Sequence, residues 1–211
     1  RYYGNKRKHL RRSETRVFFR KCGILFAEDR HEQGIDMRYR YCPQCGKKLI
    51  ERAAGDDGPV PYCKGCEKYW FDSFASCVIV MIVNEFEEIV LLQQSYMSGE
   101  YRNFVSGYMI PGENAEEAAL REVKEEVGLD LIRLESSGTW WFEEGDMLMH
   151  GFIGYAQKQD MILSEEVDAA EWVPIDKAPG LMYPDSPGNA QYGTYRVYLE
   201  KNAQRDIRGV R

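Results

Sequence analysis

Three glutamates, Glu122, Glu125 and Glu126, stand at positions i, i+3 and i+4 of the sequence. In an α-helix this spacing places their carboxylates on one side. Glu122 and Glu126 are like charges one turn apart, which costs about 0.2–0.5 kcal/mol in an isolated helix. A divalent cation removes this repulsion, and magnesium binds a few carboxylates together with water and substrate phosphates. The spacing therefore indicates metal-assisted chemistry on phosphate, with a solvated charged helix as the alternative.

The residues around these acids predict a helix over 115–127. Asn114 suits the N-cap, and Glu117 follows three residues later as in a capping box. Gly128 suits the left-handed conformation that ends many helices. Glu117 and Arg121 are expected to form an i, i+4 ion pair. The apolar stripe expected on the side opposite the acids consists of Leu120, Val123 and Val127.

A second chemical pattern consists of two C-x-x-C pairs separated by 17 residues. This spacing is typical of zinc sites, in which two tight turns bring four thiolates to one tetrahedral ion. Four protein ligands leave no open position, so we expect a structural Zn²⁺ rather than a catalytic one. Two disulfides are the alternative, but nothing in the sequence indicates a secreted protein. The four predicted ligands are Cys42, Cys45, Cys63 and Cys66, whereas Cys22 and Cys77 are expected to be ordinary buried thiols.

Alternating and apolar runs predict the elements that position these residues. The expected strands cover residues 75–84, 89–96, 101–111, 131–142, 147–157 and 171–175. A terminal helix near 190–206 is expected to place Tyr192, Tyr195 and Leu199 on one face. We expect a basic segment over 1–37, a zinc ribbon over 38–72, and a catalytic domain over 73–211 that includes the terminal helix.

Charge is distributed unevenly along the chain. Residues 1–72 contain 17 Lys/Arg and 10 Asp/Glu, whereas residues 73–211 contain 11 and 24. A basic arm that binds nucleic acid is one interpretation of the first segment. A solvated terminus is the interpretation that we favour. The longest apolar run has seven residues, whereas a membrane span needs roughly 20. We therefore expect a soluble protein that is not bound to a membrane and, since no signal peptide is recognisable, is cytoplasmic.

The acidic helix belongs to a longer motif that resembles the box of the Nudix hydrolase family. The motif runs from Gly107 over five residues to Glu113, then over seven residues to Arg121-Glu122-Val123, and ends with Glu125, Glu126, Gly128 and Leu129. The resemblance covers about residues 74–176 and implies an α+β fold, an α/β/α sandwich with a mixed β-sheet. It also implies that Glu122, Glu125 and Glu126 bind Mg²⁺ or Mn²⁺, that Glu113 contributes nearby, and that Arg121 orients the glutamates.

The ribbon in front of this domain is similar to the arrangement in the NADH pyrophosphatase subfamily. On that likeness Glu166 is a further metal-binding or basic carboxylate, with a surface acid in a turn as an equal alternative. The subfamily's Ser-Gln-Pro-Trp-Pro-Phe motif is replaced by Ser136–Phe142, which loses the Gln-Pro pair but keeps aromatic residues. Trp140, Trp141 and Phe142 are candidates to stack on a nucleobase or nicotinamide ring, although strand alternation sends at least one of them into the core.

These patterns predict an enzyme that hydrolyses a small nucleotide such as NAD(H) or ADP-ribose at its diphosphate and releases AMP. We also expect a homodimer. The alternative is a regulator that senses a ligand through the Nudix domain, or binds nucleic acid through the ribbon and basic arm. The complete set of Glu113, Arg121 and the three helix glutamates favours catalysis. A ribbon that staples the fold or a dimer is favoured over one that binds nucleic acid.

Overall fold

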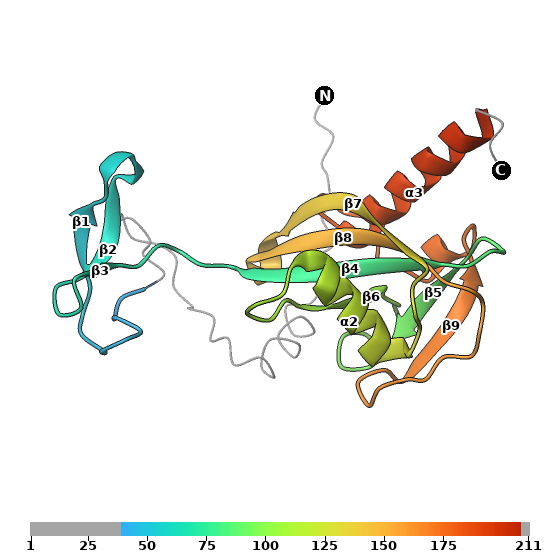
Figure 1. Ribbon diagram of the computed structural model, residues 1–211, viewed down its shortest axis with the longest axis horizontal. Coiled ribbons are helices and arrows are strands. Elements are labelled where there is room, and N and C mark those ends of the chain that lie inside the picture. The colour runs from blue at the N-terminus through green and yellow to red at the C-terminus, as the bar shows by residue number, and fades with distance from the viewer. Residues whose placement is uncertain (1–38, 208–211) are drawn as a thin grey trace, which may run out of the picture. The chain divides into compact units, whose positions relative to one another are not determined.

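The computed structural model describes residues 39–207, and the predicted basic segment 1–37 with Cys22 lies outside the described residues. The described chain separates into two compact units, one that ends at Phe74 and one that begins at Ala75 (Figure 1).

The first unit is a small antiparallel sheet of three strands, β1 (Ile50–Ala53), β2 (Pro59–Cys63) and β3 (Lys68–Tyr69). A 3-10 turn, Gly55–Asp57, joins β1 to β2. Its buried cluster consists of Cys42, Leu49 and Cys63, with Tyr39, Cys66 and Trp70 packed around them. Val60, Pro61 and Tyr62 of β2 are buried as well. So small an apolar cluster stabilises a fold only weakly, and units of this size depend on metals or disulfides.

The second unit is built on a mixed six-stranded sheet with the order β7-β8-β4-β5-β9, in which β6 also pairs with β4. Only β4 and β8 run parallel; the other pairs are antiparallel. The strands are β4 (Ala75–Val83), β5 (Glu88–Gln93), β6 (Val105–Tyr108), β7 (Arg133–Phe142), β8 (Met147–Tyr155) and β9 (Ala169–Pro174). The helices are α2 (Ala115–Val127) and α3 (Ala190–Ile207), with 3-10 turns at Glu143–Gly145 and Ala178–Gly180.

The central strand β4 shows how the two helices sandwich the sheet. Its side chains alternate, so Val78, Val80 and Ile82 join the core beneath α2. Ile79, Met81 and Val83 join the core beneath α3 on the other face. A strand that is buried on both faces reads as one continuous apolar run, as this one does. Figure 1 shows α2 and α3 against this sheet, and the predicted α/β/α sandwich with a mixed sheet is confirmed.

The capping signals around α2 are confirmed, but three other predicted details of this helix are wrong. Asn114 and Glu117 form the full capping box, and Gly128 ends the helix at φ +71°. The buried side, however, consists of Ala118, Ala119, Val123, Glu126 and Val127, while Leu120 is 46% exposed. Glu126 therefore shares the buried arc instead of opposing it. The predicted ion pair between Glu117 and Arg121 is also absent from the described residues. The Glu117 carboxylate accepts from the Asn114 amide instead, and Arg121 donates to other acids.

The terminal helix α3 packs on β7, β8 and β4. Tyr195 and Tyr198 are buried there and Tyr192 is partly buried, whereas the predicted inward position of Leu199 is wrong because its side chain is 41% exposed. Neither α2 nor α3 has the length and apolar content needed to cross a bilayer, and these are the α-helices of the described residues.

The contact between β7 and α3 depends on an absent side chain. A Cβ on Gly193 would overlap the Trp140 indole. Gly→Ala within a helix normally stabilises by about 1 kcal/mol. At this site we expect Gly193→Ala to destabilise instead, by about 1–3 kcal/mol, because it overpacks the interface. Urea denaturation measures the effect. Gly99→Ala is the control, since a Cβ there meets nothing within 4 Å. Equal or greater stability for Gly193→Ala would contradict the packing.

Candidate active site and metal centre

The acids of the box are organised around the guanidinium of Arg121. Its Nε and Nη2 donate to the two oxygens of Glu113 at 3.0 and 2.7 Å. Its Nη1 donates to Glu122 at 2.7 Å and to Glu125 at 3.0 Å, and Nη2 also donates to the Tyr108 carbonyl at 3.0 Å. These bonds lower the pKa of Glu113 and raise that of Arg121 further. One side chain thus joins the loop, the helix and the end of β6.

Glu122 lies against the backbone of β6 where the sequence has Gly107. A Cβ at Gly107 would overlap the Glu122 carboxylate, so this position admits no side chain while Glu122 keeps its place. Burial raises the pKa of Glu122, and the bond from Arg121 opposes that rise. The first residue of the box is therefore a glycine for steric reasons.

Glu126 is the most buried acid of the set, with 6% of its surface exposed. Its Oε1 accepts from the Gln94 amide at 3.4 Å, and its Oε2 has no partner within the described part of the chain. Burial, followed by the charges of Glu122 and Glu166, raises the pKa of Glu126 to about 8. The predicted Glu166 lies in the loop before β9, near enough to Glu126 for its charge to contribute.

This donor set suits magnesium. The ion takes one or two carboxylates and completes its shell with water and substrate phosphate. Glu126 offers a buried oxygen without a partner, and Glu122 offers the oxygen that Arg121 leaves free. Three carboxylates do not converge on a single point: among the described residues, only the four cysteines have ligand atoms all within 4.8 Å of one another. An open set of carboxylates leaves room for phosphate.

Sequence reasoning missed two groups that contact Glu126. Gln94, 3% exposed, follows directly on β5, and the Ser106 amide of β6 donates to the same carboxylate. The one signal was a pair of polar residues, Gln93 and Gln94, directly after the apolar run Ile89–Leu92. The partner of Gln94 lies 32 residues further on, so local spacing does not reveal the contact.

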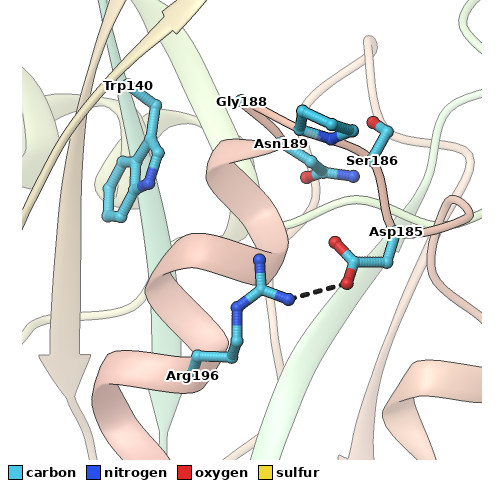
Figure 2. Close-up of a pocket in the computed structure, with 7 residues that line it drawn as sticks. Trp140, Asp185, Ser186, Gly188, Asn189 and Arg196 are labelled. Carbon is cyan, nitrogen blue, oxygen red and sulfur yellow. Dashed lines mark hydrogen bonds and ion pairs between the residues drawn. The ribbon is translucent and has the colours of Figure 1, made fainter.

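The three aromatic candidates on β7 are divided between the two faces of the sheet. Trp140 and Phe142 pair with Met149 and Met147 on the α3 face, whereas Trp141 pairs with Leu148 on the α2 face. Figure 2 shows Trp140 across a pocket from Arg196, which bonds Asp185 at 2.7 Å. The structure therefore places only Trp141, 42% exposed, on the same face as the acids.

The four predicted zinc ligands converge in the first unit. The sulfur atoms of Cys42 and Cys66 are 3.9 Å apart, and those of Cys45 and Cys63 are 3.5 Å apart. Zinc–sulfur bonds of about 2.3 Å in a tetrahedron place sulfurs about 3.8 Å apart. These distances match zinc coordination and exclude disulfide bonds in the structure.

The protonation of these thiols also favours a cation. Burial acts to raise the pKa of Cys42, but hydrogen bonds from the amides of Cys45 and Gln44 outweigh it and lower the pKa to about 6. The bond to Cys45, together with burial, raises the pKa of Cys66 to about 12. Without a metal the cluster therefore keeps some thiols protonated, and a dication is needed to ionise all four.

The ribbon generates a first metal prediction. The purified chain should contain about one zinc ion, and Cys63→Ser should expose residues 39–74 to limited proteolysis, because the apolar cluster is too small to hold the unit. Elemental analysis and mass spectrometry of the fragments measure both effects. Cys77→Ser, in the other unit, is the control. A protein without zinc that carries disulfides at the four positions would exclude this site.

Glu126 generates a pH prediction for protein that holds zinc but no magnesium. In the unfolded chain a glutamate titrates at about 4.3, whereas the folded chain keeps Glu126 protonated up to about pH 8. The folded state binds the extra proton between these values, so stability decreases as pH rises from 5 to 8. Thermal melting should show this fall, and Glu126→Gln should flatten it. An identical slope in the variant would contradict the assignment.

The NUDIX domain model matches residues 73–193. The NAD-capped RNA hydrolase NudC of Stutzerimonas stutzeri is 31% identical over 147 residues, which cover 68% of this chain and 51% of that protein. The NAD-capped RNA hydrolase of Schizosaccharomyces pombe is 33% identical over 140 residues, 59% of this chain and 36% of that protein. The chain thus spans about half of the length of the first relative and about a third of the second.

The fold has known counterparts as well. A NUDIX hydrolase from Nitrosomonas europaea superposes with a TM-score of 0.60 at 17% identity, covering 79% of this chain and 93% of that one. At this identity the likeness concerns the fold alone. The family model spans more than half of the 211 residues and includes every acid bound by Arg121. The chain belongs to the NUDIX domain family.

Proposed function

We propose that this chain is a magnesium-dependent hydrolase that cleaves the diphosphate of NAD(H), ADP-ribose or a related compound and releases AMP. The observation that carries the proposal is the acid set held by Arg121 beside the buried Glu126. The names of the curated relatives support the NAD part of this substrate class. An NAD-capped RNA contains the same diphosphate and belongs to the class.

In this mechanism Glu122, Glu125 and Glu126 would hold magnesium. When bound, the ion withdraws charge from phosphate oxygens and activates water. Arg121 keeps Glu122 and Glu125 ionised and fixed. Glu166, beside Glu126, accepts a proton from the attacking water. The water oxygen bonds to phosphorus as the bridging oxygen leaves with the second phosphate.

The proposal assigns the remaining parts different duties. The zinc ribbon, residues 38–72, is a structural unit attached to a NUDIX domain that starts near residue 73. Trp141 supports a ring of the substrate, because it is the aromatic residue of β7 on the acid face. Trp140 and Phe142, on the other face, are removed from the substrate contacts. The homodimer and the cytoplasmic location remain predictions.

A ligand sensor is the second candidate, because a fold by itself does not decide between ligand sensing and catalysis. The complete acid set disfavours it, because binding alone does not need a buried carboxylate poised for a cation. An assay of nucleotide hydrolysis separates the two candidates, since a sensor binds the nucleotide without hydrolysing it.

The test of the proposal combines charge removal with a substrate panel. Glu122→Gln, Glu125→Gln and Glu126→Gln each keep size but remove a ligand charge, so kcat should fall by about 10²-fold or more, at least ~2.7 kcal/mol of transition-state stabilisation. Glu116→Gln changes an exposed acid at the start of α2 and should leave kcat unchanged. AMP release from NADH, NAD, ADP-ribose, FAD and diadenosine polyphosphates is measured with magnesium.

The panel also tests selectivity. Because the Gln-Pro pair is absent and an aromatic contact remains, kcat/KM for NADH and ADP-ribose should differ by no more than about 10–200-fold. A preference for NADH above about 10⁴-fold would reject the broad-substrate part of the proposal. Normal turnover in all three glutamine variants would reject catalysis by this acid set.

A further inference from the structure

Part of the α2 face of the sheet is left open to solvent. α2 packs on β6 and β4, whereas α3 packs on the opposite face. Beyond α2 the same face continues over β4, β8 and β7. We call this surface the open face; its residues are Ser76, Thr139, Trp141, Leu148 and His150. Thr139 is exposed and Trp141 is 42% exposed, whereas the other three residues are partly exposed.

The open face adjoins the acid set by strand register. Gly107, which lies against Glu122, pairs with Val78, and Val78 pairs with His150. Two strand spacings separate Gly107 from His150, about 10 Å. His150 pairs with Thr139, so Trp141 is its diagonal neighbour at about 7–8 Å. A substrate whose phosphates lie at Glu122 therefore reaches this face with its nucleoside.

One tautomer of His150 satisfies both side-chain contacts of Ser76. The Ser76 hydroxyl donates its one proton to the Met109 sulfur, 3.1 Å away. Ser76 Oγ lies 2.9 Å from His150 Nε2 and so accepts from it. In the neutral imidazole the proton then sits on Nε2, which leaves Nδ1 as an acceptor. Nδ1 has no partner within the described residues. A side chain of the sheet thus holds one unused acceptor beside an exposed indole.

We propose that His150 is a specificity-determining residue that accepts a hydrogen bond from an exocyclic amino group on a ring stacked on Trp141. This inference rests on the proposed function for the position of the phosphates. Two rings of an NAD-type substrate carry such a group, adenine at its amine and nicotinamide at its carboxamide. The shared chemistry is an N–H donor on a planar ring. Ser76 acts through His150 as a positioning residue.

The test measures binding of mononucleotides to the full chain by calorimetry in the presence of magnesium. AMP is compared with IMP, which replaces the adenine amine by a carbonyl. Nicotinamide mononucleotide is compared with nicotinate mononucleotide, which replaces the carboxamide by a carboxylate. One hydrogen bond at a partly exposed site is worth up to about tenfold in Kd. We expect the amino compound to bind about tenfold more tightly in one of the two pairs, and that pair identifies the ring.

Variants assign the preference to Nδ1. His150→Leu keeps bulk but removes the acceptor, so the preferred pair should become equal. His150→Asn offers an amide oxygen near the place of Nδ1 and should keep part of the preference. Ser76→Ala frees the tautomer and should weaken it. Leu199→Ala changes an exposed apolar residue of α3, outside the open face, and should leave the ratio unchanged.

The outcomes separate this inference from the proposed function. Equal affinities within both pairs, no binding of any of the four, or an unchanged preference in His150→Leu would overturn the role of His150. A preference that depends on His150 in a chain that hydrolyses none of the panel would support the inference and reject the enzyme. The opposite result has two parts: the chain hydrolyses NAD in a way that depends on Glu122, and His150→Leu leaves the kcat/KM ratio of NAD to its hypoxanthine and nicotinate analogues unchanged. That result would support the enzyme and reject the role of His150.

Discussion

The ion-pair network of Arg121 is the interaction on which the acid site depends. Its planar fork binds Glu113 through two bonds and spreads the remaining donors over Glu122, Glu125 and the Tyr108 carbonyl. Three carboxylates this close repel one another, and a permanently charged guanidinium offsets that repulsion without titrating. Because the same group bonds β6, the loop at Glu113 and helix α2, loss of the charge disturbs the geometry and the electrostatics together. The capping box supports this arrangement by fixing where α2 begins, and thus which turn carries Arg121.

Glu126 shows the cost of placing a carboxylate on the buried arc of a helix. Ala119 and Val123 pack on the same side, and burial alone disfavours the charged form. The fold tolerates this acid because Gln94 and the Ser106 amide partly satisfy it. A group that a stable core would replace by an apolar one is instead kept ready for a cation. Sites that conflict with packing in this way are characteristic of function.

Sequence reasoning succeeded where the signal is local. The cap at Asn114, the end of α2 at Gly128 and the spacing of the four cysteines each depend on a few neighbouring residues, and all appear in the structure. The errors at Leu120 and Leu199 arose because helical periodicity gives an apolar stripe but not its angular limits, which the facing strands set. The contacts Gln94–Glu126 and Ser76–His150 join residues 32 and 74 positions apart. Only the completed sheet brings such pairs together.

The aromatic residues of β7 show most clearly that local sequence does not reveal which face of a sheet a side chain takes. Up to Ser136, which pairs with Phe152, the strand alternates in one phase; Ser137 is then an extra residue, and pairing resumes at Gly138 with Gly151. Gly138 has φ +132°, a conformation that glycine adopts readily at a bulge. Ser137 bonds Thr194 of α3, so the inserted residue lies on the α3 face. Without this bulge, strict alternation would turn Trp140 toward the acid face and Trp141 toward α3. One added residue therefore decides which tryptophan packs the core and which one lies on the face of the acids.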